Sequence, residues 1–174
     1  MRRTLIALFA VVLASSVALG PQARAASDDN AQINALYQQF TTAFRNKDVD
    51  AVMSVYVAGP SLFVFDVGTP REHVGSDSYR ADWKSLFASL KGPTISSFEI
   101  TELAVVISGN VAYSHSIQHF SGTTPNGKPL ALTVRVTDVL RKIDGKWLIV
   151  MEHVSVPINF TTMKPDLTSR RMAI

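Results

Sequence analysis

The sequence predicts an α+β fold in which helices come first and a curved antiparallel sheet wraps around them. Most apolar residues between 27 and 90 recur at the three- and four-residue spacing of amphipathic helices. From residue 94 onward, apolar and polar residues alternate as they do in half-buried strands. Asp144-Gly145 separates two such alternating runs, and this dipeptide is a strong signal for a β-hairpin. Helices followed by consecutive strands are typical of α+β domains.

The first half of the chain predicts three helices and one short strand. The first helix is expected to start at an N-cap among residues 27–29 and to bury one apolar stripe. That stripe comprises Ile33, Leu36, Tyr37, Phe40 and Phe44. Asp48 can cap a second, short helix. Residues 62–65 predict a strand that ends at Asp66, residues 68–75 a loop, and Ser76 or Asp77 can cap the third helix.

Strands are expected at 94–107, 111–121, 130–143 and from 146 onward. An unbroken register counted outward from the turn places Asp138 opposite Met151 and Val136 opposite His153. On that reading Asp138, His153 and Ser155 share one mainly apolar face. Polar groups of this kind are costly to bury and are not expected on a sheet face that only packs against a core.

The opposite face of the same hairpin is mixed in character, as a partly covered or partner-facing surface would be. It holds Arg135 and Glu152 on neighbouring strands. We expect these two residues to pair at an interface.

Residues 1–25 fit a secretion signal that is cleaved off. Arg2 and Arg3 precede an apolar run, and Ala-Arg-Ala at 23–25 fits the cleavage rule. The alternative, a membrane anchor, is disfavoured by the short run and by the Gly-Pro that follows it. We therefore expect a secreted or periplasmic protein with one domain at 26–158 and a loose polar tail at 159–174.

Cleavage also changes the charge. It removes three arginines and no acids, so Lys plus Arg falls from 17 to 14, against 14 Asp plus Glu. A mature protein without net charge is not expected to bind nucleic acid or a membrane.

The residue types do not predict a metal or an organic cofactor. The chain has no cysteine, which excludes disulfides, a thiol nucleophile and thiolate ligands. His115 and His119 are four residues apart on one strand, about 13 Å at extended rise, so they cannot share an ion.

Three phrases resemble the SnoaL-like branch of the nuclear transport factor 2-like superfamily, which contains homologues of ketosteroid isomerase. They are F-R-N-K-D-V-D-A-V-M-S-V-Y at 44–56, G-S-D-S-Y-R-A-D-W at 75–83 and R-V-T-D-V-L-R-K-I-D-G-K-W at 135–147. The last phrase is also similar to the association domain of calmodulin-dependent protein kinases. The resemblance implies a cone-shaped half-barrel with a pocket at its wide end, and homodimers formed through the outer face of the sheet.

Asp138, His153 and Asp66 are the candidate catalytic residues. A carboxylate on an apolar inward face has a raised pKa and becomes a usable base. Alternatively, Asp138 lies in solvent at the mouth of the cone, His153 is a core histidine bonded to a carbonyl, and Asp66 opens an Asx turn. A Ser-His-Asp triad with Ser155 is not favoured, since the serine lacks a nucleophile elbow.

The candidate residues for binding a small molecule are expected to line the pocket. They are Tyr56, Trp83, Tyr113, His115, Met151 and Ser155. We expect a small hydrophobic or carbonyl-bearing ligand and, if the protein is an enzyme, a cofactor-independent isomerase or lyase. The alternative is a non-catalytic module that binds a ligand or forms a dimer.

Overall fold

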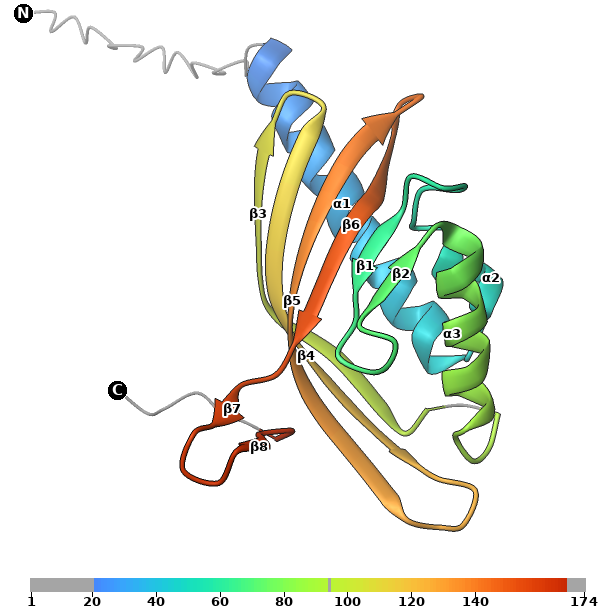
Figure 1. Cartoon of the computed structure of the whole chain (residues 1–174). Coiled ribbons are helices and arrows are strands. Elements are labelled where there is room, and N and C mark those ends of the chain that lie inside the picture. The colour runs from blue at the N-terminus through green and yellow to red at the C-terminus, as the bar shows by residue number, and fades with distance from the viewer. Residues whose placement is uncertain (1–20, 94, 169–174) are drawn as a thin grey trace, which may run out of the picture.

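A curved, open sheet carries helices on its concave face (Figure 1). The computed structural model describes residues 21–93 and 95–168, with side chains from residue 28 onward. The six strands of the sheet are ordered β2-β1-β6-β5-β4-β3, and every neighbouring pair is antiparallel except β1 and β6. The predicted α+β class, with helices first and a curved sheet around them, is confirmed.

Three helices pack against this sheet. They are α1 (Pro21–Arg45), α2 (Val49–Met53) and α3 (Ser76–Ala88). The predicted cap of α2 is confirmed, because Oδ1 of Asp48 accepts a hydrogen bond from the Ala51 amide at 3.0 Å. The predicted start of α1 at residues 27–29 is wrong, since the helix already runs from Pro21. The predicted caps of α3 are also wrong, because its N-cap is Gly75, which makes no side-chain cap.

The strands of the six-stranded sheet follow the prediction, with one strand added. They are β1 (Phe63–Phe65), β2 (Glu72–Val74), β3 (Ser97–Ser108), β4 (Val111–Thr123), β5 (Pro129–Ile143) and β6 (Lys146–Ser155). The sequence predicted a loop where β2 forms. This short strand pairs with β1 and brings His73 opposite Val64.

The register of the β5–β6 hairpin is regular only near its turn. Leu140 lies opposite Ile149 as predicted, but Val139 lies opposite Met151, so β6 contains one extra residue there. Beyond this bulge every side chain of β6 changes face. Asp138 therefore faces Glu152 rather than Met151.

Aromatic side chains from α1, α3 and β3 form the centre of the core. Phe44 stacks on Phe98 with ring centroids 4.0 Å apart, and Trp83 packs edge-on against Phe44 at 5.4 Å. The predicted apolar stripe of α1 is buried along its length. This packing fixes α1 and α3 over the concave face and leaves the space described below.

The C-terminal segment is ordered as far as the structure describes it. Strands β7 (Ile158–Asn159) and β8 (Lys164–Pro165) form a small hairpin, and the Thr133 amide donates to the Leu167 carbonyl at 2.7 Å. The tail predicted at 159–174 thus contains a small hairpin, and its residues beyond 168 lie outside the described residues.

Most of the predicted signal peptide, up to residue 20, also lies outside the described residues. Among the helices that are described, none combines the length and the apolar character needed to span a membrane.

Candidate functional site

Two carboxyl groups face each other inside the protein. Asp138 on β5 and Glu152 on β6 are cross-strand partners, with exposed fractions of 1% and 4%. Directly opposed residues of an antiparallel pair have Cβ atoms about 4.5–5.5 Å apart. The bulge in β6 creates this arrangement, because it turns Glu152 toward the helices.

Two tyrosines hold the carboxyl of Glu152. The Tyr56 hydroxyl donates to Oε2 at 2.9 Å, and the Tyr79 hydroxyl donates to Oε1 at 2.6 Å. Burial raises the pKa of Glu152 well above its usual value, and the neighbouring charge of Asp138 raises it further. The two hydrogen bonds act in the opposite direction but are weaker. Glu152 therefore tends to keep its proton.

Asp138 has its own set of donors. The Tyr37 hydroxyl donates to Oδ2 at 2.7 Å, and Oγ of Ser114 lies 3.3 Å from the same oxygen. Burial raises the pKa of Asp138 to about 6, while hydrogen bonds from Tyr37, Glu152 and Ser114 limit the rise. Oδ1 of Asp138 has no hydrogen-bond partner in the described part of the chain. A proton on Glu152 directed at Asp138 satisfies both groups, so the pair is expected to hold one proton near neutral pH.

A cavity of about 140 Å³ lies against Glu152, between α1, α3 and the concave face of the sheet. Its apolar wall comes from α1, α3, β3, β4 and β5, together with single residues of β6 and the loop after β1. That wall comprises Phe40, Phe44, Val67, Trp83, Leu86, Phe98, Phe120, Leu130, Leu132, Val134 and Val154. The polar lining is Asp66, Tyr79, Asp82, Gln118 and Glu152. An engineered cavity of about 150 Å³ accommodates benzene, so the space suits a single ring.

Two surface hollows of about 620 Å³ each are larger than this cavity. One lies mostly on the outer face of β3, β4 and β5, and the other lies beside α1 and β3. Neither contains Asp138 or Glu152. The smaller, mainly apolar space with convergent polar groups has the character of a ligand site.

Trp83 contributes a further polar group to the cavity wall. Its side chain is buried, and its indole N–H has no hydrogen-bond partner among the residues described. Buried indole N–H groups normally find an acceptor. A ligand oxygen in the cavity would supply one.

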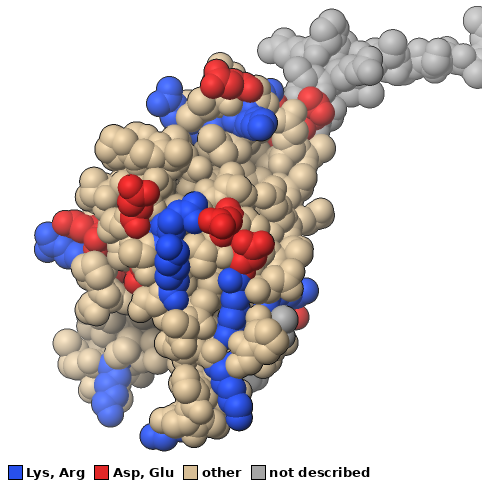
Figure 2. Space-filling model, turned by 90° about the vertical axis from the view of Figure 1, so that its right-hand side faces the viewer, with Lys and Arg blue, Asp and Glu red and all other residues tan. Residues whose placement is uncertain are grey.

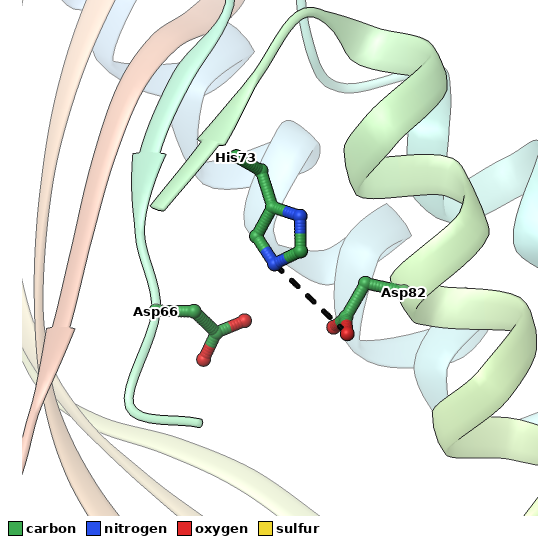
Figure 3. Close-up of side chains that lie close together, drawn as sticks. All are labelled: Asp66, His73 and Asp82. Carbon is green, nitrogen blue, oxygen red and sulfur yellow. Dashed lines mark ion pairs between the residues drawn. The ribbon is translucent and has the colours of Figure 1, made fainter. Parts of the chain in front are cut away.

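A second polar cluster lies at the edge of the cavity (Figure 3). Asp66 follows β1, His73 is on β2 and Asp82 is on α3, and their side chains point toward one another. Nε2 of His73 is 3.9 Å from Oδ1 of Asp82. Oδ1 of Asp66 accepts a hydrogen bond from the Gly68 amide, two residues further on, at 3.4 Å, so the expected Asx turn is present. Burial raises the pKa of Asp82, as does the charge of Asp66, whereas His73 lowers it.

Four predicted site residues lie in or beside this region. Asp138 is buried behind Glu152. Asp66 and Trp83 line the cavity, and Tyr56 donates a hydrogen bond to Glu152 from the side of the core. The reading that left Asp138 in solvent is excluded by its burial. The catalytic or binding roles of these residues stay predictions.

The bulge overturns the expected places of two residues. His153 is exposed and contacts Phe65 with ring centroids 5.6 Å apart, so it faces away from the cavity and is not a core histidine. Glu152 is buried instead of exposed. The expected surface pair of Arg135 with Glu152 is therefore wrong, and Arg135 lies opposite Ser155.

Other predicted binding residues also lie away from the cavity. Tyr113 and His115 are exposed because β4 buries the alternate residues, such as Ser114 and Ser116. Met151 and Ser155 are half-buried and do not line the cavity.

Several residues of the two clusters were not predicted to belong to a site. Tyr37 was assigned to the core by its helical spacing, which is correct but incomplete. Asp82 follows Tyr79 by three residues, so both lie on one helix face, and this was a usable signal. His73 could not be placed without β2.

This chain is similar to known proteins in its fold. The family described as SnoaL-like domain matches residues 33–159. A search of curated proteins found no match.

Several solved structures share the fold. A nuclear transport factor 2-like protein of unknown function from Pseudomonas putida is 22% identical with a TM-score of 0.72, covering 83% of this chain and 98% of its own. A ketosteroid isomerase-like protein from Erwinia carotovora atroseptica is 24% identical with a TM-score of 0.58, covering 72% and 93%. A proposed dehydratase from Streptomyces avermitilis is 18% identical with a TM-score of 0.64, covering 74% and 96%.

Proposed function

Because the chain belongs to the family of SnoaL-like domains, we propose that it binds a small apolar molecule with a carbonyl group and moves a proton on it. The ligand would occupy the cavity beside Glu152, with one ring against the aromatic wall. The reaction class would be an isomerisation or the loss of water. The names of two solved relatives, one ketosteroid isomerase-like and one a proposed dehydratase, agree with that class.

The observation that carries this proposal is the pair of buried carboxyls, Asp138 and Glu152. Burying an ionised group costs several kcal/mol unless it is well compensated, and an apolar pair would be cheaper in a core. Here both carboxyls are present, three tyrosine hydroxyls donate to them, and Glu152 lies in the wall of a cavity. Groups with strongly shifted pKa values in a cavity are typical of sites that transfer protons.

The shared proton suggests how Glu152 would act. When the proton resides on Asp138, Glu152 is an ionised carboxylate with a high affinity for protons, and it faces the ligand. It could take a proton from the carbon next to the carbonyl, leaving an enolate whose oxygen accepts the Trp83 N–H. Returning the proton to another carbon completes an isomerisation, and loss of a β-hydroxyl as water completes a dehydration.

Asp138 is a positioning residue in this scheme. It does not line the cavity, and it acts by accepting or releasing the proton of Glu152. Tyr56 and Tyr79 fix the carboxyl of Glu152 in one orientation.

The test does not require the natural substrate. We would follow exchange of the α-protons of cyclohexanone with D₂O by proton NMR, in the presence of the wild-type protein, Glu152→Gln, Asp138→Asn and the exposed control Glu99→Gln. Wild type and Glu99→Gln should accelerate exchange, Glu152→Gln should not, and Asp138→Asn should be slowed. Exchange that is unaccelerated by wild type, although the ketone binds, would refute the proposal. So would acceleration that survives in Glu152→Gln.

Charge on the surface favours a small-molecule ligand over a polyanion. Figure 2 shows Lys and Arg interspersed with Asp and Glu on the side that α2 and α3 form. Arg80 pairs with Asp50, and Arg71 with Glu72, among the exposed groups. The face seen in Figure 2 is therefore mixed in sign and does not form the continuous basic stripe typical of nucleic-acid-binding proteins.

Export is part of the same proposal, and residues 1–25 support it through their signal-like pattern. Cleavage after residue 25 would shorten α1 by five residues. Intact mass of the protein from the medium or periplasm should show Ala26 as the first residue. An intact N-terminus confined to the cytoplasm would contradict export.

A second candidate function, a dimerising module, rests on the outer face of the sheet. Val106 and Tyr113 are cross-strand partners that are 49% and 50% exposed, and Val111 beside them is 47% exposed. Sedimentation should show a homodimer that Tyr113→Glu dissociates and that the control Val74→Glu leaves intact. A wild-type monomer at all concentrations would contradict it.

A further inference from the structure

Three side chains that ligate metals in other proteins converge at the edge of the cavity. Asp66, His73 and Asp82 come from three separate elements, and one ligand atom of each lies within 4.8 Å of the others. In Figure 3 the two carboxylates and the imidazole point into a common space. An imidazole with two carboxylates is a donor set suited to a divalent ion of borderline softness.

His73 provides an independent sign that a ligand belongs there. The side chain is 4% exposed, and Nε2 has no hydrogen-bond partner in the parts of the chain that the structure describes. Nδ1 lies 3.1 Å from Oγ of Ser78, which fixes the ring with Nε2 directed at Asp82. A buried nitrogen without a partner is unfavourable unless something occupies the space in front of it. A metal-ligating histidine commonly has its other ring nitrogen held in this way.

We propose that Asp66, His73 and Asp82 bind one divalent transition-metal ion, Zn²⁺ in preference to Mg²⁺ or Ca²⁺. The imidazole favours zinc over the two hard ions, which prefer oxygen ligands alone. This inference stands apart from the proton transfer proposed for Glu152, because it uses other residues and requires no turnover.

The three donor atoms would have to move only slightly closer together to bind one zinc ion. Bonds of about 2.0–2.2 Å to zinc keep two donor atoms within roughly 4.4 Å of each other. Nε2 of His73 and Oδ1 of Asp82 already satisfy this limit at 3.9 Å. Asp66 and Asp82 are half-buried, so rotation of their carboxylates can supply the remaining movement.

The site would be open on one side. Three protein ligands leave at least one coordination position of zinc free, as in catalytic rather than structural sites. Because Asp66 and Asp82 also line the cavity, that position would face it. The ion could then coordinate an oxygen atom of a molecule bound in the cavity.

The competing interpretation is an ion pair without metal, in which a protonated His73 faces Asp82. It predicts no specific zinc binding, so one experiment separates the two.

Calorimetric titration with ZnCl₂, on protein without an affinity tag, tests the proposal. We expect one ion per chain, with an affinity that falls at least 10-fold in His73→Asn and in Asp82→Asn. His153→Asn, an exposed histidine on the outer face, is the matched control and should bind as wild type does. Absence of binding, or equal affinity in His73→Asn and wild type, would overturn the proposal. Circular dichroism of each variant reports whether it is folded.

A second measurement uses the unmodified chain and does not depend on the folding of a variant. In protein labelled with ¹⁵N-histidine, zinc should shift the Nε2 signal of His73 first among the four histidines. If His115, His119 or His153 shifts first, the ion binds at the surface and the proposal is wrong. Titration with MgCl₂ should leave all four signals unchanged.

Discussion

Asp138 and Glu152 lie directly opposite each other on β5 and β6, inside the protein, at positions that an unbroken hairpin would place on opposite faces. One extra residue in β6 brings them together. The consequence is chemical as well as geometric, since two carboxyls that meet without solvent cannot both be ionised at low cost. The bulge therefore brings the two carboxyls of the candidate site together.

Stability should depend on pH in a direction set by this pair. The pKa of Asp138 rises from 3.8 to about 6 on folding, and that of Glu152 rises well above 4.5. The folded state then holds more protons than the unfolded state above about pH 4. The contribution of Asp138 is fully present below pH 3.8 and is lost as the pH rises through 6.

We expect the free energy of unfolding to fall by about 1.4 kcal/mol per pH unit for each such proton. Urea denaturation of wild type and Asp138→Asn between pH 4 and pH 8 measures this. The stability difference between the two proteins should change across that window. A constant difference would mean that Asp138 titrates at its ordinary value.

Removing a hydroxyl from Tyr56 or Tyr79 should destabilise the protein. Each donates to a buried carboxyl, and loss of such a bond costs about 1–3 kcal/mol. Urea denaturation of Tyr56→Phe and Tyr79→Phe tests this, with the exposed Tyr113→Phe as a control that should change little. Equal stability of all three variants would indicate that the two bonds do not form.

Asp29 should stabilise the contact between α1 and the β5–β6 hairpin. Its Oδ1 accepts hydrogen bonds from Lys142 at 2.6 Å and from the Trp147 indole at 3.0 Å, and these bonds lower its pKa. Asp29→Ala should lower the free energy of unfolding by about 1–3 kcal/mol. Asp28→Ala is the matched control, because Asp28 is exposed and, among the described residues, accepts a hydrogen bond from Gln32 one helical turn away. A loss as large in the control would argue against a specific role for Asp29.

The aromatic core should be sensitive to truncation at Phe98. This side chain is 2% exposed and stacks on Phe44. Phe98→Ala should cost about 3–5 kcal/mol, measured by chemical denaturation. Phe160→Ala removes a ring that is 83% exposed and should be nearly neutral. A cost below about 1 kcal/mol for Phe98→Ala would show that the core collapses around the gap.

Much of the fold could be predicted because the relevant signals are local. The turn at Asp144 and Gly145 has positive φ angles of 49° and 80°, as the dipeptide implies, and the register is correct from there to Leu140. The apolar stripe of α1 could likewise be recognised from spacing alone.

The bulge could not be predicted from the pattern of residues. The run Leu148-Ile149-Val150-Met151 is apolar at every position, so either face of the strand can be buried at similar cost. The alternation of apolar and polar residues therefore does not indicate a bulge here. The prediction therefore placed Asp138 on the correct face of the sheet. It placed Glu152 on the outer face and His153 on the inner face, and the structure shows the reverse. The cluster of Asp66, His73 and Asp82 depends on the tertiary packing of three elements, for which the sequence carries no periodic signal.

Asp138 and Glu152 are expected to share one proton at neutral pH. The most direct measurement is a ¹³C NMR titration of the carboxyl carbons of Asp138 and Glu152, assigned with Asp138→Asn and Glu152→Gln. We predict that one step occurs near pH 6 and that the other carboxyl releases its proton well above its ordinary value of 4.5. Titration of both carboxyls near 3.8 and 4.5, their ordinary values, would contradict the claim.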